Sequence, residues 1–213
     1  MTDHRMDWDR ITRTGTAEAV LCDSKSVDQI AAILLTAQAV GQRLLLTRLV
    51  AEMAEKLARD TLDYDTASQT AILGGPAPQP MRTGIGIVAA GTSDLPIAAE
   101  AQRTLAFHGV HAPITADVGV AGIWRLMDQI ETLHQHRVLI AIAGMEGALF
   151  SVLAGLVRAP VIAVPAPVGH GVARGGRLAL DAALGSCAPG VVAVNIGNGF
   201  GAACAALRML GDR

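Results

Sequence analysis

The chain has 213 residues, of which 51% are hydrophobic, 17% charged and only 3% aromatic. This length suits one domain, or one domain with a small partner, and the apolar content excludes a disordered chain. Its 17 basic and 19 acidic side chains leave a net charge of −2. That balance argues against a general binder of nucleic-acid backbones, and the scarcity of aromatic rings argues against a stacking platform for single strands.

A mean hydropathy of +0.41 raises the question of a membrane span. The most apolar stretch runs from Val138 to Val157, but Gly144, Gly147 and Gly155 interrupt it, so we expect a buried strand and a helix there instead. The opening MTDHRMDWDR lacks the apolar run of a secretory signal, and the three cysteines show no CxxC spacing. These features predict a cytoplasmic protein with reduced thiols and no membrane partner.

The turn-rich segment GGPAPQP, residues 74–80, predicts a boundary between a domain at 1–80 and a domain at 81–213. Charge is dense before this segment, whereas glycine is frequent after it. In the first part, Ser26 and Gln29 form a potential capping box for a helix. The pattern predicts a small α+β domain with helices at Val27–Ala39 and Val50–Arg59 and strands at Arg43–Thr47 and Gln69–Leu73.

The second part alternates short apolar runs with amphipathic segments. The runs predict strands at Ile85–Ala90, Pro113–Asp117, Val138–Ala143, Val161–Pro165 and Val191–Asn195. The intervening segments predict helices from Pro96 to about His108 and at Ile123–Leu133, Ala148–Val157, Leu178–Leu184 and Ala202–Leu210. Strands that are apolar throughout indicate a parallel sheet buried on both faces, so we expect a three-layer α/β sandwich.

In such a sheet, ligands bind beyond the carboxyl ends of the strands. A loop rich in small residues follows each predicted strand, and these loops contain Gly91-Thr92-Ser93-Asp94, Asp117-Val118-Gly119, Gly144-Met145-Glu146-Gly147, the loop of His170, and Gly197-Asn198-Gly199. The first loop precedes a helix, so its hydroxyls and amides are suited to an anion. An ordinary helix cap by Ser93 or Asp94 explains the same residues equally well.

Glu146 is the only charged residue between Val138 and Arg158. A carboxylate in a glycine-rich loop after a buried strand has a raised pKa if it is desolvated, and that would suit proton transfer. The structural alternative is an exposed carboxylate that stabilises a helix N-terminus.

Cys187 lies in a loop that contains Pro189, whereas Cys204 falls in an alanine-rich segment typical of a buried, unreactive thiol. A loop cysteine is a possible nucleophile, although the C-terminus of the preceding helix does not favour a thiolate. The six histidines form no zinc pattern, and His170 is the one that lies in a predicted ligand loop.

Four strings in the sequence resemble the LarB family, which begins the synthesis of the nickel-pincer nucleotide cofactor: GIVAAGTSDLPIAAEA, DVGVAGIWRL, AGMEGALFSVLAGLVRAPVIAVP and GSCAPGVVAVNIGNGFGAA. The opening RITRTGTAEAVLCDSKS also resembles that family, so the likeness covers nearly the whole chain. The C-terminal part is similar to phosphoribosylaminoimidazole carboxylase, which implies a flavodoxin-like sheet and an octamer. The chain departs from the LarB pattern at Trp124, His170, Gly185 and Gly197.

The resemblance implies a reaction on nicotinic acid adenine dinucleotide and CO2. The pyridinium ring is carboxylated and the phosphoanhydride is hydrolysed, which yields pyridinium-3,5-biscarboxylic acid mononucleotide and AMP. Cys187 is implied as the covalent nucleophile and Glu146 as the proton acceptor. The Gly91–Asp94 loop and Asp117 would hold the nucleotide. No organic cofactor is implied, and Mg²⁺ is an expected companion of the phosphates.

Two other functions remain open. One is aminoimidazole ribonucleotide carboxylation, although that family carries SAHRT after its second strand where this chain has DVGVAG. The other is a non-catalytic nucleotide-binding module, which would need neither Cys187 nor Glu146. Because Cys187 precedes the fifth strand and Glu146 follows the third, we expect Cys187 at the amino end of the sheet and Glu146 at its carboxyl end. The sequence therefore predicts a homo-oligomer in which Cys187 enters a neighbouring subunit's site.

Overall fold

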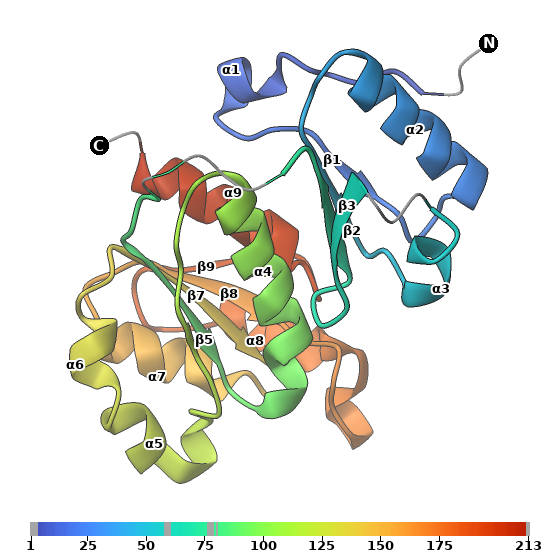
Figure 1. Ribbon diagram of the computed structural model, residues 1–213. Helices are drawn as coiled ribbons and strands as arrows, with labels where there is room; N and C mark the ends of the chain where they lie inside the picture. The colour runs from blue at the N-terminus through green and yellow to red at the C-terminus, as the bar shows by residue number, and fades with distance from the viewer. Residues whose placement is uncertain (1–3, 58–60, 76–78, 80, 212–213) are drawn as a thin grey trace. The chain divides into compact units, whose positions relative to one another are not determined.

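Figure 1 shows the computed structural model, which describes residues 4–57, 61–75, 79 and 81–211. Contacts along the chain divide it into two compact units. The first consists of Met1–Pro80 together with Phe107–Gly109, and the second of Met81–Ala106 and Val110–Arg213. Most of the predicted linker at 74–80 lies outside the described residues.

The first unit contains a four-stranded mixed sheet in the order β1-β2-β4-β3. Its strands are β1 (Ala19–Leu21), β2 (Leu44–Thr47), β3 (Leu62–Asp65) and β4 (Thr70–Leu73). Only β1 and β2 are parallel, whereas β4 runs antiparallel to both of its neighbours. Helices α1 (Arg10–Thr14), α2 (Val27–Ala39) and α3 (Ala51–Ala54) complete the unit. The predicted capping box is confirmed, because Ser26 Oγ accepts from Gln29 N and Gln29 Oε1 accepts from Ser26 N.

The helix predicted over Val50–Arg59 is present but shorter than expected. Helix α3 ends at Ala54, residues 55–57 form a turn, and 58–60 lie outside the described residues. The chain turns there because it must return to begin β3 at Leu62, and Leu57 is buried in the core. Strands β1 and β3 were not predicted, since the first has only three residues and the second carries two aspartates.

The second unit contains a five-stranded parallel sheet in the order β6-β5-β7-β8-β9 (Figure 1). Its strands are β5 (Ile85–Ala89), β6 (Ile114–Thr115), β7 (Val138–Ala143), β8 (Val161–Pro165) and β9 (Val191–Ala193). In chain order this is the 2-1-3-4-5 arrangement of a flavodoxin-like fold, which confirms the predicted parallel sheet. Every residue of β5, β7 and β8 is buried, as expected for a sheet covered on both faces.

Helices cover the two faces of this sheet and create two separate cores. On one face lie α4 (Leu95–Phe107) and α9 (Gly199–Leu210). On the other lie α5 (Ile123–Met127), α6 (Ile130–Leu133), α7 (Ala148–Leu156) and α8 (Arg177–Leu184), and Figure 1 shows these layers. Short 3₁₀ segments, η2 (Thr92–Asp94), η3 (Val120–Gly122) and η4 (Gly171–Gly176), occupy the loops after β5, β6 and β8.

Three predicted elements differ most from the structure. The helix expected at Ile123–Leu133 is divided into α5 and α6, because Gln129 N–H bonds to the Leu126 carbonyl and tightens the turn between them. The second strand is only Ile114–Thr115, because Asp117 has a φ of 57° and leaves the sheet. The last helix begins at Gly199 rather than Ala202, since Asn198 caps it.

Among the helices of the described chain, none is long and apolar enough to cross a membrane. The most apolar stretch of the sequence is divided between β7 and α7, and α7 has only nine residues. The turn through Gly144 and Gly147 separates the two elements, as the sequence predicts.

The core beneath α7 supplies a test of this packing. Phe150 is fully buried among the side chains of α7, α8 and the sheet. The substitution Phe150→Ala removes most of its side chain and leaves a cavity, so we expect a loss of about 3–5 kcal/mol in the free energy of unfolding. Leu35 on α2 is 66% exposed, and Leu35→Ala serves as the control, with a change within about 0.5 kcal/mol. Urea unfolding measures both, and equal losses would contradict the assigned core.

Candidate active site

A cavity of about 430 Å³ opens at the carboxyl ends of β5 and β7, where the strand order of the sheet reverses. Connections leave these two neighbouring strands in opposite directions, which opens a crevice between their loops. The loops after β5, β6, β7 and β8 all contribute to its walls. This is the place where the sequence predicts a ligand site.

The structure brings together eight of the thirteen predicted site residues in this cavity. They are Gly91, Ser93, Asp94, Gly119, Gly144, Met145, Glu146 and His170. Thr92, Asp117, Gly147, Asn198 and Cys187 do not line it. Val120, Leu149 and Val168 also line the cavity, and no signal in the sequence marked these apolar residues. Their presence makes part of the cavity lining apolar.

Two glycines allow the loops to approach each other closely. A Cβ on Gly144 would lie 2.2 Å from the Val168 carbonyl oxygen, and one on Gly119 would lie 2.9 Å from the Ala90 carbonyl oxygen. Both distances are too short for any other residue without movement of the backbone. Close contact therefore fixes the loop after β7 against the loop after β8, and the loop after β6 against the end of β5.

Asp94 is the most buried charged side chain of the cavity, with 3% of its surface exposed. It belongs to the 3₁₀ turn η2, and its Oδ2 accepts the Gly91 N–H at 2.9 Å. The aspartate thus closes its own loop from the third position of the turn, whereas Gly91 occupies the N-cap position where Ser93 or Asp94 was the alternative expectation. Thr92 and Ser93 remain exposed, and Ser93 faces the cavity. Burial raises the pKa of Asp94, although the Gly91 hydrogen bond opposes this shift.

This raised pKa predicts a pH-dependent stability. The folded chain binds the Asp94 proton more tightly than the unfolded chain does, so ionisation of Asp94 opposes folding. Relative to Asp94→Asn, the wild type should lose stability as pH rises from about 4 through the raised pKa, and the difference should then stay constant. Urea unfolding of both proteins between pH 3 and pH 7 measures the difference. A wild type that gains stability over this variant with rising pH would contradict the assignment.

Glu146 lines the cavity but is exposed. The desolvation that would favour proton transfer is therefore not provided by the described residues of a single chain. Met145 beside it has a φ of 53°, a strained backbone for a side chain of this kind, and its N–H bonds weakly to the Val168 carbonyl at 3.4 Å. This conformation holds the Met145–Glu146 turn above the end of β7.

Asp117 lies outside the main cavity, in a neighbouring depression of about 410 Å³ that also contains Trp124 and Arg125. Its Oδ1 pairs with Arg125 Nη1 at 2.9 Å. Arg125 was not predicted as a site residue, although it stands eight residues after Asp117 on the segment that forms α5. The pair places a guanidinium group beside the loop that leads from β6 into the cavity.

Two predicted binding residues have structural roles at helix N-termini. Gly147 caps α7 with a φ of 65°, and a Cβ there would lie 2.8 Å from the ring of Phe150. Asn198 caps α9, and its Oδ1 accepts the Gly201 N–H at 2.8 Å. These contacts account for both residue types without a ligand.

The three cysteines are free and differ in exposure. Cys187 is exposed in the loop before β9, at the amino ends of the strands. Cys22 is buried, and burial raises the pKa of its thiol to about 12. Cys204, which the sequence predicts to be buried, is only partly buried on α9. Among these thiols, Cys187 is the accessible one on a loop.

The described residues contain no group of three or more His, Cys, Asp or Glu side chains that could hold a metal ion. Glu146 and Asp94 are the carboxylates of the cavity, and one oxygen of Asp94 is already bonded to Gly91.

The order of strands and the position of the cavity define a flavodoxin-like α/β protein with a cavity at its topological switch point. The chain matches the AIR carboxylase family over residues 84–213 and the LarB/PurE-like N-terminal domain over residues 1–74. It belongs to this LarB/PurE-like carboxylase family.

Two individual proteins illustrate the relationship. An uncharacterized protein of Methanocaldococcus jannaschii is 36% identical over 208 residues, which cover 93% of this chain and 80% of that protein. A crystal structure of a PurE2 variant from Treponema denticola has a TM-score of 0.44 and 23% identity, and the match covers 62% of this chain and 83% of that one.

Proposed function

We propose that this chain carboxylates the pyridinium ring of nicotinic acid adenine dinucleotide and hydrolyses its phosphoanhydride. The products are pyridinium-3,5-biscarboxylic acid mononucleotide and AMP. The observation that carries the proposal is the succession, in one chain, of a LarB-type N-terminal domain and an AIR carboxylase domain. The cavity at the switch point of that second domain supports it, because it offers glycine-rich loops, Ser93 and Glu146 to a nucleotide.

The chemistry requires a nucleophile because a pyridinium ring is electron-poor and does not attack CO2. Addition of the Cys187 thiolate to the ring forms a C–S bond and gives an enamine-like dihydropyridine. An electron pair of that ring then forms the new C–C bond to CO2. Glu146 removes the proton from the carboxylated carbon, and loss of the thiolate restores the aromatic ring. No oxidant or reductant is consumed, and the thiol is regenerated.

The remaining residues of the cavity would bind the nucleotide. Ser93 and the amides of the Gly91–Asp94 turn are suited to a phosphate, and Gly119, Gly144 and Met145 would contact the substrate through their backbones. His170, in the loop after β8, also lines the cavity. Since the described chain lacks a cluster of ligating side chains, Mg²⁺ would be bound mainly by phosphate oxygens and water.

A site shared between subunits is part of this proposal. Cys187 precedes β9 and Glu146 follows β7. In a parallel sheet, Cys187 therefore lies at the amino ends of the strands and Glu146 at their carboxyl ends. The surface beside Cys187 carries Leu184, which is 67% exposed, and Val192 on the edge strand β9, which is 41% exposed. Exposed apolar side chains on and beside an edge strand are typical of surfaces that another subunit covers. We therefore propose a homo-oligomer, an octamer as in the purine enzyme, in which Cys187 enters a neighbour's cavity.

Incubation with nicotinic acid adenine dinucleotide and bicarbonate tests the activity. Mass spectrometry should detect the dicarboxylated mononucleotide together with AMP. We expect Cys187→Ala to lower the rate at least a hundredfold, because no thiolate adduct can form, and Glu146→Gln to lower it by a factor of about 10²–10⁴. Cys204→Ala is the matched thiol control and should keep the wild-type rate.

Wild-type turnover by Cys187→Ala would refute the covalent mechanism. Carboxylation of aminoimidazole ribonucleotide in place of the dinucleotide would assign the chain to the purine reaction of its C-terminal domain's family. Turnover of neither substrate would favour a nucleotide-binding module.

Mixing two inactive variants tests the shared site. If Cys187 and Glu146 of different subunits form one site, co-refolded Cys187→Ala and Glu146→Gln chains should recover about a quarter of the wild-type activity, because random pairing leaves one site in four intact. Neither variant alone should show this activity. A mixture that stays inactive while native mass spectrometry shows mixed oligomers would mean that each subunit uses its own cysteine.

A further inference from the structure

A second cavity, of about 390 Å³, lies in the first unit, which includes Phe107–Gly109. It shares no lining residue with the candidate active site. Its walls include Trp8, Ile11, Glu18, Gln42, Arg43 and Phe107. Nothing in the proposed carboxylation uses these residues, so the cavity requires a separate explanation.

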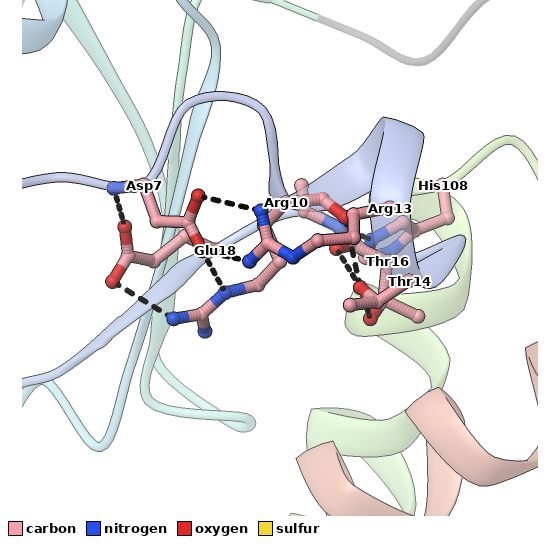
Figure 2. A network of polar contacts seen from close by, with 8 residues as sticks. Asp7, Arg10, Arg13, Thr14, Thr16, Glu18 and His108 are labelled. Atoms are coloured by element: carbon pink, nitrogen blue, oxygen red, sulfur yellow. Dashed lines mark hydrogen bonds and ion pairs between the residues drawn. The ribbon is translucent and has the colours of Figure 1, made fainter.

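The carboxylates of this cavity are already neutralised, as Figure 2 shows. Asp7 pairs with Arg13 at 2.6 Å and with Arg10 at 3.2 Å, and Glu18 pairs with Arg10 at 3.3 Å. The backbone N–H of Asp7 donates to the second oxygen of Glu18. The Arg13 hydrogen bond holds the pKa of Asp7 below its usual range, so the network contains two anions and two cations. Its charges cancel, and its acceptors are occupied.

Arg43 is different, because its charge has no anionic partner among the described residues. The guanidinium carbon lies 4.6 Å from the centre of the Phe107 ring, and the two terminal nitrogens donate to the carbonyls of Phe107 and Gly75. The Nε–H is buried without a hydrogen-bond partner. Burial also lowers the pKa of Arg43. A guanidinium without a carboxylate partner gains a charge-assisted hydrogen bond from an anion beside its terminal nitrogens, so such an anion would stabilise the unit.

The shape of the cavity narrows the identity of that anion. Trp8, Ile11 and Phe107 provide an apolar and partly aromatic wall, and Ile11 is 50% exposed. The volume lies at the lower end of the range of about 300–1,000 Å³ for small-molecule pockets. A single uncompensated cation matches one negative charge, and the fork of an arginine is suited to a carboxylate.

We propose that this cavity is a binding site for a small, flat aromatic monocarboxylate. The ring lies against Trp8 and Ile11, and the carboxylate accepts the N–H groups of the two terminal Arg43 nitrogens that the carbonyls of Phe107 and Gly75 leave free. This inference does not depend on the proposed reaction, because the residues and the ligand differ from those of the candidate active site.

Fluorescence tests the proposal directly, because the chain has only two tryptophans. Trp124→Phe leaves Trp8, which lines the cavity, as the single reporter. We expect saturable quenching by benzoate and none by benzamide, the neutral analogue of the same shape, at equal concentrations. Isothermal titration calorimetry of the full chain provides a second measurement. Equal binding of benzoate and benzamide, or binding of neither, would overturn the proposal.

Two variants locate the site. Arg43→Met removes the cation, and Ile11→Glu places a second anion at an exposed position of the wall, where it should not disturb folding. Each should weaken benzoate binding about tenfold or more. Arg48→Met is the control, because Arg48 pairs with Asp23 and does not line the cavity. Unchanged affinity in a folded Ile11→Glu protein would place benzoate elsewhere and refute the site. Equally tight binding of inorganic phosphate would refute the aromatic specificity.

Discussion

Burial of one parallel sheet on both faces is the constraint on which the second unit depends. Because α4 and α9 cover one face while α5–α8 cover the other, solvent reaches the sheet mainly at its ends and edges. The carboxyl ends of all five strands lie at the same end of the sheet. The chain order 2-1-3-4-5 separates the connections that follow β5 and β7. The cavity follows from that separation. Its detailed shape follows from loops that only glycine allows to meet, at Gly119 and Gly144.

The sequence predicted the elements that burial dominates. Continuous apolar runs such as Val138–Ala143 and Val161–Pro165 occur as strands with the same boundaries, because such runs are stable only inside a covered sheet. Strands β1 and β3 were missed because short or polar edge strands depend on their neighbours more than on their own composition. The break between α5 and α6 was missed for a related reason, since one backbone hydrogen bond decides it.

In the candidate site, too, some features follow from the sequence pattern, whereas others depend on contacts that form only on folding. The topology rule identified the loops that meet in the cavity, because the chemistry of a loop and its place after a strand are both visible in the sequence. Side-chain partners were not visible. Asp94 turns back to its own loop, Asp117 pairs with Arg125, and Asn198 caps α9. Each of these depends on where a second group lies after folding, so residue type alone predicted candidates but not roles.

In a single chain, neither of the two proposed catalytic groups has the surroundings that its proposed role requires. Glu146 occupies the cavity but is exposed, and Cys187 is exposed beside apolar side chains at the other edge of the sheet. In an oligomer, the Cys187 surface of one subunit could pack against the cavity of its neighbour. Such a contact would bury both surfaces and bring the Cys187 thiol to the Glu146 carboxylate. The covered surface would also account for the high apolar content of a chain with few charges. Assembly and catalysis would therefore depend on the same apolar contacts.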